Sequence, residues 1–510
     1  MSLVWRVLLS PNYMRRIVVV SALAGAALCL VLFALRISSV FSLGDPVWAM
    51  TSGDEQSSLY AIWRAIHGEP VYFNRFQPPF SLASYNWLFY FFYSNTTDAV
   101  LSMFGLGDAW LPTVTRGITL AGALLIAMLV YRIAIERWPA PARDAQYLAL
   151  TIAILVGLGP LVGFWAMTTR ADIWALTFET AAVFVFLRYS SRAPWPSMVA
   201  MIVLTYLAWS FKQTGILIIV TFGLFLLIRG KWLQGVIFGT SLAALFACTF
   251  ALHDYAYVEN ILFLGVPLEY TPMRMIHNLG NFIIKFQPML FLLAGAVVAF
   301  RFSGLRTLLR ESDAAVFALT GLVVGFALCL SATNQLGSAE NYYFSFSLLA
   351  ALGGAELLAR QPDIAPQRGW LMQGALASGW VLLSVALLIA LSGVHGRTNV
   401  DDQNAEIHAA KACLDKLPRP VFTISNILSL PWIIPGNGEY FVLSDLYHED
   451  FLVNAPFADN GIAGLIEKGY FASVFTDAYD DREVIYGGSL NQYTRVQDKS
   501  CDGFRALVRQ

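Results

Sequence analysis

The sequence predicts a polytopic α-helical membrane protein that carries a small α/β domain at its C-terminal end. Three observations support this fold class: the composition, a series of long apolar segments, and the distribution of charge between the loops. Of the 510 residues, 57% are hydrophobic and 13% are charged, whereas soluble globular proteins carry about 25% charged residues. The net charge of −1 does not indicate a nucleic-acid partner, so the partner that the composition predicts is membrane lipid.

About eleven apolar segments are candidates for membrane spans, at roughly 20 residues per crossing. The first is longer than the core of a signal peptide and is not followed by a small-residue cleavage site, so we expect it to remain as a helix. The predicted spans are residues 17–38, 112–133, 146–166, 172–188, 195–210, 214–228, 233–252, 282–300, 314–332, 342–359 and 371–393.

The loop charges indicate how these spans are oriented. With a cytoplasmic N-terminus, the basic residues concentrate before the first span and in every even-numbered loop, as the positive-inside rule requires. The short loops of the opposite side contain only Arg170, Lys212, Arg274 and Lys285 as basic residues. An odd number of spans then places the long first loop, about residues 40–111, and the C-terminal segment outside.

The first external loop is predicted to contain helices that lie in the membrane interface. Apolar side chains recur at helical spacing between Gln56 and His67, and residues 81–94 contain a run of aromatic side chains. Both segments are too short and too polar to span the bilayer, which favours helices with their apolar faces against lipid. Gly and Pro residues at 68–70 and 77–79 separate them.

The chain divides into a membrane domain, residues 1–395, and a polar external domain, residues 396–510. Mixed strand and helix patterns predict a small α/β domain for the second part. Strands are expected at 421–424, 440–443 and 470–475, and helices at 405–417 and 462–468.

Five cysteines fall into two groups. Cys29, Cys248 and Cys329 lie in apolar runs and are expected to be inert. Cys413 and Cys501 lie in the external domain, where an oxidising compartment would allow them to form a disulfide. Two unpaired thiols are the alternative, because spacing alone does not establish connectivity.

The segment Ser52-Gly53-Asp54-Glu55 follows the first span directly and admits two interpretations. The pattern Ser-x-x-Glu is typical of a capping box at a helix start, where acidic side chains are favoured. Alternatively, Asp54 is a general base that takes a proton from an attacking hydroxyl, with Glu55 as its neighbour. The two interpretations are compatible, because a helix cap also holds its residues in a defined geometry.

Arg170, Asp172 and Lys212 lie at the external ends of later spans. Snorkelling, a local ion pair and an interfacial anchor would together explain these residues without a functional role. The functional alternative is recognition of a phosphate by a guanidinium fork and an ammonium group. Several cations on the side that carries Asp54 favour this alternative.

Two further external segments are polar. Residues 253–285 are predicted to close over a substrate, and residues 337–343 either line a sugar pocket or cap the tenth span. The residues of interest are Arg274 and His277 in the first segment, and Glu340, Asn341 and Tyr342 in the second. Their spacing does not match a metal-ligand pattern. The sequence also contains no P-loop, dinucleotide fingerprint or HExxH motif, which argues against nucleotide-driven and zinc-protease chemistry.

These features together resemble the GT-C superfamily of membrane glycosyltransferases. The resemblance rests on the acidic pair after the first span, Gly-Glu-Pro-Val-Tyr at 68–72, Gln-Pro-Pro-Phe at 77–80, and Arg-x-Asp at the head of a later span. It is strongest to bacterial relatives of the protein O-mannosyltransferases and of the lipid A aminoarabinose transferase. It covers about residues 1–395 and does not extend to the external domain.

The resemblance implies an inverting transfer of a sugar from a polyprenyl-phosphate donor to a lipid, glycan or protein acceptor. The reaction would take place at the external face of a bacterial inner membrane, without a cofactor or a metal ion. Asp54 would act as the base, and Glu55 would orient the acceptor. Arg170, Lys212 and Arg274 would hold the donor phosphate. The substrate pocket would include Asp172, His277, Glu340, Asn341 and Tyr342.

Three other interpretations remain open. A ligase or polymerase of lipid-linked glycans would share the donor but couple whole glycans. A lipid or sugar transporter would need polar groups deep within the spans or paired broken helices, whereas the predicted spans carry most of their charges at their ends. A structural membrane subunit with a partner-binding external domain is the third.

Overall fold

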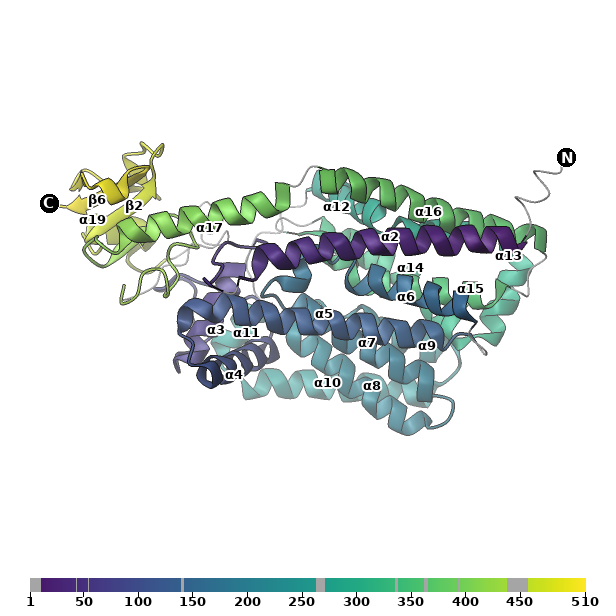
Figure 1. Ribbon diagram of the computed structural model, residues 1–510. Coiled ribbons are helices and arrows are strands. Elements are labelled where there is room, and N and C mark those ends of the chain that lie inside the picture. The colour runs from purple at the N-terminus through teal and green to yellow at the C-terminus, as the bar shows by residue number, and fades with distance from the viewer. Residues whose placement is uncertain are drawn as a thin grey trace.

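A computed structural model shows an elongated bundle of long helices with a small sheet domain at one end (Figure 1). We call the end beside this domain the sheet end and the end beside the N-terminus the basic end. The structure describes residues 11–42, 44–53, 55–138, 142–262, 271–334, 338–361, 366–392, 395–437 and 457–510.

Every predicted span corresponds to a helix of the bundle. Helix boundaries agree with the predicted segments to within a few residues at most ends. The helices are α2 Pro11–Val40, α5 Leu111–Ile135, α6 Arg143–Gly157, α7 Asp172–Tyr189, α8 Pro194–Phe211, α9 Leu217–Ile228, α10 Trp232–Leu252, α13 Gln287–Glu311, α14 Asp313–Thr333, α15 Phe344–Ala359 and α16 Pro366–Ser392.

Not all of these helices are long and apolar enough to cross a bilayer alone. Seven described helices meet this standard, or eight if the pair α12 Pro272–Lys285 and α13, bent by 84° at their junction, counts as one broken span. Helix α9 has 12 residues and α6 has 15, which is short for a 30 Å core. The polytopic helical fold is therefore confirmed, while the count of eleven spans stays a prediction.

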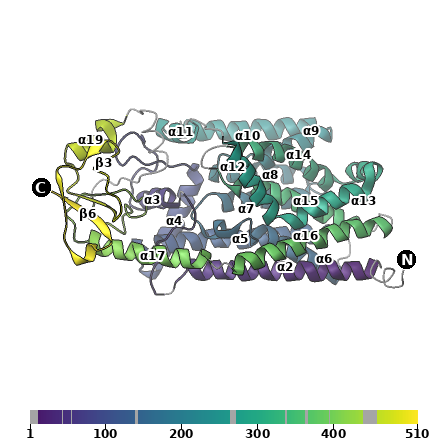
Figure 2. The same ribbon diagram turned by 90° about the horizontal axis from the view of Figure 1, so that it is seen from above.

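Close packing of the bundle depends on small residues at helix crossings. Helices α2 and α16 lie side by side in both ribbon views (Figures 1 and 2). A Cβ atom added to Gly25 of α2 would lie 2.5 Å from the ring of Trp380 in α16. A Cβ atom added to Gly379 would lie 2.7 Å from Cα of Pro288 in α13. Small residues at such crossings allow the backbones to approach closely, as is common for helices in membranes.

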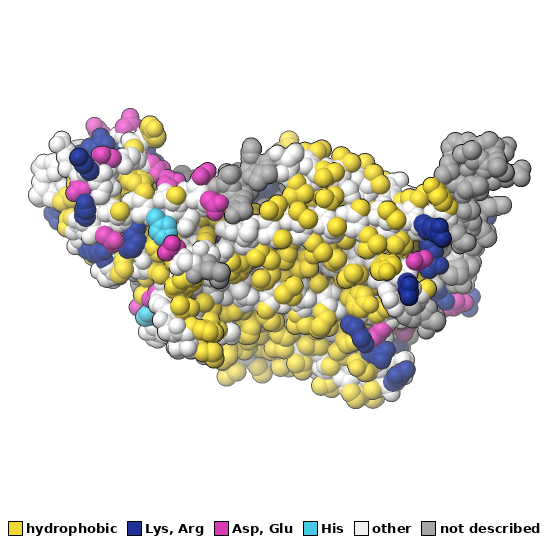
Figure 3. Space-filling model, viewed as in Figure 1, with side chains coloured by type: hydrophobic (Ala, Val, Ile, Leu, Met, Phe, Trp, Pro, Cys, Tyr) yellow, Lys and Arg dark blue, Asp and Glu magenta, His cyan; other side chains and the backbone are white. Residues whose placement is uncertain are grey.

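The surface of the bundle is apolar along its length and charged at its ends. Figure 3 shows a broad hydrophobic face, with Lys and Arg side chains at the basic end and also, mixed with Asp and Glu side chains, on the sheet domain. Ion pairs at this end join Arg15 to Asp144 and Arg229 to Asp313. The orientation expected from the positive-inside rule stays a prediction.

The first long loop forms two helices, as predicted. Helix α3 spans Glu55–Ile66 and helix α4 spans Trp87–Phe104. The side chain of Asn86 caps the start of α4, and Gly105 ends it in the left-handed conformation, which glycine adopts without a steric penalty. Helix α4 leaves Phe91 and Met103 largely exposed, as expected for a helix in contact with lipid. The turn η1 Asp108–Trp110 then leads into α5.

Short helices and turns complete the sheet end of the bundle, and a small domain follows it. The shorter elements are η2 Gly163–Met167, α11 Tyr255–Leu262 and η3 Glu340–Tyr343. The domain begins with α17 His395–Leu414 and also contains η5 Ala458–Asn460, α19 Gly461–Glu467 and η6 Lys499–Cys501. Its strands are β1 Val421–Thr423, β2 Ser473–Asp477, β3 Val484–Ile485, β4 Gly488–Ser489, β5 Tyr493–Arg495 and β6 Phe504–Arg509.

A four-stranded sheet with the order β1-β2-β6-β5 organises this domain. β1 runs parallel to β2, and the other two pairings are antiparallel. The predicted strand at 421–424 is confirmed, and the one at 470–475 begins later, at Ser473. The predicted strand at 440–443 lies outside the described residues. A disulfide joins Cys413 to Cys501 with a Cα–Cα distance of 4.9 Å, so the paired alternative is confirmed.

The sheet domain and the first loop share one hydrophobic core. Trp48 packs against the ring of His408, and its backbone N–H donates to Asn404 of α17 at 2.7 Å. The N–H of Ala458 donates to the carbonyl oxygen of Phe76 at 2.8 Å. Residues from both regions form a single cluster of buried side chains. The domain therefore rests on the loop that contains Asp54.

Candidate active site

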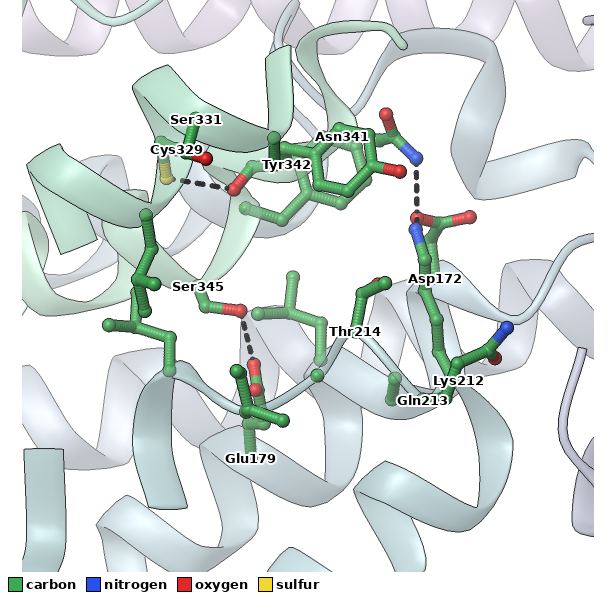
Figure 4. Close-up of a pocket in the computed structure, with 18 residues that line it drawn as sticks. Asp172, Glu179, Lys212, Gln213, Thr214, Cys329, Ser331, Asn341, Tyr342 and Ser345 are labelled. Atoms are coloured by element: carbon green, nitrogen blue, oxygen red, sulfur yellow. Dashed lines mark hydrogen bonds and ion pairs between the residues drawn. The ribbon is translucent and has the colours of Figure 1, made fainter. Parts of the chain in front are cut away.

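A cavity of about 340 Å³ lies between α7, α9, α14 and α15 at the sheet end of the bundle. Figure 4 shows the side chains that line it. Its polar and charged lining residues are Asp172, Glu179, Lys212, Gln213, Thr214, Ser331, Asn341, Tyr342 and Ser345. The remaining lining is largely aliphatic, which is usual for a small-molecule site.

Breaks in the helices bring these polar groups together. Helix α8 ends at Phe211 and α9 begins at Leu217, and the linker between them presents Lys212 and Gln213 to the cavity. The turn η3 enters α15 on the opposite wall and supplies Asn341 and Tyr342. Irregular backbone at membrane depth is tolerated where it lines a cavity, because its polar groups then find partners.

Asp172 is the centre of a buried charge cluster. Its Oδ1 accepts hydrogen bonds from Nζ of Lys212 and, at 2.7 Å, from Nδ2 of Asn341. Its Oδ2 lies 3.6 Å from Nε of Arg170. The Lys212 ammonium also lies 4.9 Å from the ring centroid of Tyr342. Two cations thus share one carboxylate, and this cluster carries a net positive charge.

Arg170 connects this cluster to the first loop. Its Nη1 donates to the carbonyl oxygen of Gly53 at 2.5 Å, and its guanidinium lies 4.7 Å from the ring centroid of Trp165. Asp54 itself is outside the described residues, so its side chain is not located here. Its neighbour Gly53 is held through Arg170 to Asp172, which lines the cavity.

Glu55 is fully buried and forms an ion pair with Arg116 of α5. Its Oε1 accepts from Arg116 Nε at 3.0 Å and from the N–H of Thr169 at 2.9 Å. Its Oε2 accepts from Arg116 Nη2 at 2.9 Å and from the N–H of Thr51 at 3.0 Å. Burial alone would raise the pKa of Glu55, but the Arg116 charge and these hydrogen bonds hold it below its usual value. The carboxylate therefore joins the start of α3 to α5 and to the segment between η2 and α7.

Three predicted site residues lie elsewhere at the same end of the bundle. Arg274 of α12 donates from Nε to the carbonyl oxygen of Ser338 at 3.1 Å. His277 lies 3.1 Å from the amide of Asn281. Glu340 is paired with Lys285. None of the three is among the residues that line the cavity, whereas Asp172, Lys212, Asn341 and Tyr342 are.

Sequence reasoning missed Arg116 and the pair Glu179–Ser345. Glu179 lies seven residues after Asp172 in α7, so the two side chains share a helix face. That spacing, together with an ionisable residue inside an apolar span, is a signal that could have identified it. Arg116 is likewise an ionisable residue inside an apolar span, that of α5, and could have been identified in the same way.

Metal binding has no candidate cluster in the part of the chain that the structure describes. There, no group of three or more His, Cys, Asp and Glu side chains is arranged to hold an ion. Metal-independent chemistry stays a prediction.

A helical membrane bundle, two helices in its first long loop and a C-terminal domain resting on that loop together make up the fold of this chain. Among solved structures, the chain is similar to ArnT from Cupriavidus metallidurans in the apo state, with a TM-score of 0.57. The same protein bound to undecaprenyl phosphate gives a TM-score of 0.53. Sequence identity is 14% in both comparisons, which cover 94% of this chain and 97% of ArnT.

The archaeal oligosaccharyltransferase AglB from Archaeoglobus fulgidus, in complex with an inhibitory peptide and a dolichol-phosphate, is also similar. Its TM-score is 0.51 at 14% identity, with 89% of this chain and 69% of AglB covered. No protein-family model matches the chain, and no curated protein sequence matches it. At these identities the comparisons establish the fold alone, and the predicted fold class, a polytopic helical bundle with a small C-terminal α/β domain, is confirmed.

Proposed function

We propose that this protein is a membrane glycosyltransferase that moves a sugar from a polyprenyl-phosphate-linked donor to an acceptor, with inversion at the anomeric carbon. The observation that carries the proposal is the cavity in which Lys212 and Asp172 meet, linked through Arg170 to the loop before residue 54. The related fold of ArnT, whose crystal structure contains undecaprenyl phosphate, supports a donor of this class.

Lys212 and Arg170 are the proposed ligands of the donor phosphate. Negative charge develops on this phosphate as the bond to the sugar lengthens, and preorganised cations in a partly dry cavity stabilise that charge better than water does. Asp172 holds both cations in place before the donor arrives. Arg274 is a weaker candidate, because it lies outside the cavity lining and donates to a backbone carbonyl.

Asp54 is the proposed general base, and Glu55 and Arg116 are the proposed frame that positions it. The buried Glu55 carboxylate makes hydrogen bonds to Thr51, Thr169 and Arg116. These contacts support a positioning role for Glu55 in preference to direct contact with the acceptor. The metal-independent mechanism is part of this proposal.

The proposed location is the inner membrane of a bacterium, with the N-terminus in the cytoplasm and the sheet domain outside. The gathering of Lys and Arg side chains at the basic end supports this orientation (Figure 3). The lipid tail of the donor would stay in the bilayer while its head group enters the cavity. The acceptor, whether a lipid, a glycan or a protein, would approach from the external side.

The test is the substitution Asp54→Asn, assayed with purified protein and radiolabelled undecaprenyl-phosphate sugars. Loss of the base should lower the rate of transfer by about 10²- to 10⁴-fold, while expression and membrane insertion stay normal. The matched control is Asp45→Asn, because Asp45 is an exposed acid in the same loop. Normal turnover by the Asp54→Asn protein would remove the assignment of the base.

A ligase of lipid-linked glycans is the second candidate, favoured by the similarity to the oligosaccharyltransferase AglB. Monosaccharide transfer and glycan ligation differ in the mass added to the acceptor. Mass spectrometry of the product therefore separates them. A transporter would release no sugar from the labelled lipid in the same assay.

A further inference from the structure

The deep end of the cavity contains a buried carboxylate that the proposed mechanism does not use. Glu179 is 1% exposed and lies two helical turns beyond Asp172, about 10 Å further along α7. Its Oε2 accepts a hydrogen bond from Ser345 Oγ at 2.5 Å. Its Oε1 has no hydrogen-bond partner among the described residues. A buried carboxylate oxygen without a donor is costly, so its position implies an occupant that donates.

Two further oxygen atoms of residues that line the cavity are also buried without a hydrogen-bond donor among the described residues. The amide nitrogen of Gln213 donates to the carbonyl oxygen of Ser84 at 2.9 Å, and that of Asn341 donates to Asp172. These bonds determine which atom of each amide is the oxygen. Within the described part of the chain, both amide oxygens lack a partner and are buried. Among the described residues, these three acceptors of the cavity therefore receive no hydrogen bond, and neither does Oδ2 of Asp172, which faces Arg170 at 3.6 Å.

The position of Glu179 separates this end of the cavity from the cationic end. Figure 4 shows Glu179 and Ser345 across the opening from Asn341 and Tyr342, with Lys212 and Asp172 to one side. Gly215 forms the wall near Glu179, where an added Cβ atom would lie in van der Waals contact with Oε1, at 3.8 Å. The absence of a side chain at Gly215 therefore leaves room beside this oxygen.

An anionic phosphate does not suit this end. A phosphate group accepts hydrogen bonds and carries negative charge, so it repels Glu179 and offers no donor to its Oε1. A sugar ring has several hydroxyl groups at short spacing, and each donates one hydrogen bond. The chemistry of the lining therefore matches polyhydroxy groups at the Glu179 end and phosphate at the Lys212 end.

We propose that Glu179 forms the deep end of a subsite that binds the hydroxyl groups of the donor sugar and thereby selects which sugar is used, with the amide oxygens of Gln213 and Asn341 as further acceptors nearer the cationic end. This inference rests on the proposed function, because it assigns the orientation of the donor in the same cavity. The phosphate lies at Lys212 near the first loop, and the sugar points toward Glu179. The hydroxyl nearest Glu179 donates to Oε1, and sugars that lack a donor there are rejected.

The experiment measures binding of two kinds of lipid by the full-length protein in nanodiscs. The probes are undecaprenyl phosphate and its glucosyl, galactosyl and mannosyl phosphodiesters, with affinities determined by native mass spectrometry. For wild type we expect at least one glycosyl lipid to bind more tightly than undecaprenyl phosphate. The substitution Glu179→Gln should lower the affinity for that glycosyl lipid by about tenfold or more, since hydrogen bonds to charged groups are strong. Its affinity for undecaprenyl phosphate should change by less than about twofold.

Two other variants keep the test decisive. Ser345→Ala should also lower the affinity for that glycosyl lipid, by a smaller factor than Glu179→Gln. If Glu179→Gln does not fold, the result for Ser345→Ala tests the sugar subsite in its place. The matched control is Glu356→Gln, because Glu356 is another buried carboxylate, on α15 at the basic end. This control should alter the affinity of neither lipid.

Two results would overturn the sugar subsite. One is an equal loss of affinity for both kinds of lipid in Glu179→Gln, which would mean that the residue supports the fold or the phosphate. The other is an unchanged preference among the three sugars. Sugar transfer by wild type, measured in parallel, separates the two proposals. If wild type transfers sugar but Glu179→Gln leaves the preference among the sugars unchanged, only the sugar subsite is refuted. If wild type binds one glycosyl lipid selectively but transfers no sugar, only the proposed transferase activity is refuted.

Discussion

The two ends of the helical bundle use ionisable side chains in different ways. At the basic end, the side chains of Arg15 and Asp144 are paired but remain 46% and 40% exposed. At the sheet end, the side chains of Glu55 and Arg116 are both 0% exposed. The first pair lies in water at the end of the helices, whereas the second is enclosed by protein.

The difference shows which charges decide topology and which ones build a site. Exposed pairs contribute about 0–1 kcal/mol each, so the basic end acts mainly through the sign and number of its charges. Burying an ion pair costs several kcal/mol per ion in lost hydration, and only good geometry offsets that cost. At the sheet end, the buried pair of Glu55 and Arg116 lies beside the loop that contains Asp54. Such burial is expected where side chains must be held in a fixed geometry for a reaction.

Breaking the buried pair should give the largest effect. The substitution Arg116→Leu leaves the Glu55 carboxylate buried without its cation, so we expect a loss of about 3–5 kcal/mol in the free energy of unfolding. Denaturant titration in detergent micelles measures it. The double substitution Glu55→Leu with Arg116→Leu should recover much of this stability but little transfer activity, because the frame around residue 54 is lost. Full activity in the double variant would contradict the positioning role.

Removing a cation from the cavity should have an intermediate effect. Lys212→Ala removes a charge-assisted contact to the phosphate, so the affinity for undecaprenyl phosphate should fall by about 1.5–3 kcal/mol. Lys285→Ala is the matched control, since Lys285 is paired with Glu340 on the same side but does not line the cavity. Equal losses in the two variants would show that affinity follows net charge and does not depend on the cavity.

Breaking an exposed pair at the basic end should have the smallest effect. Arg15→Ala removes a pair that is almost half exposed on both sides, so the free energy of unfolding should change by about 1 kcal/mol or less. The same denaturant titration measures it, with transfer activity expected to stay at the wild-type level. A loss as large as that of Arg116→Leu would remove the contrast between the two ends.

Much of the fold was predictable, because apolar length and helical period are local properties of the chain. All eleven predicted spans correspond to helices, and so do the two helices of the first loop. The Cys413–Cys501 disulfide was one of two open alternatives, and contact between α17 and η6 decided it. Strand β2 began three residues late, because Tyr470 to Ala472 lead into the sheet without being part of it.

The candidate site was predictable only in part. Asp172, Lys212, Asn341 and Tyr342 line one cavity, and each lies at a helix break at the sheet end of the bundle; their roles stay predictions. Arg274, His277 and Glu340 satisfied the same criteria of charge and side, yet no residue of α12 lines the cavity, and Glu340 is paired with Lys285. The partner of Glu55 was not predictable, because Arg116 is 61 positions away along the chain.

By itself, the sequence determined the helices and the end of the bundle at which the acidic and basic candidates gather. Those features follow from hydrophobicity and loop charge, which act over one helix at a time. Only the tertiary structure decided that Glu55 is paired with Arg116. It also decided that Glu179 lines the cavity with one carboxylate oxygen that receives no hydrogen bond from the described residues. Such contacts depend on how each helix is rotated against its neighbours, and that rotation is set by packing between distant segments.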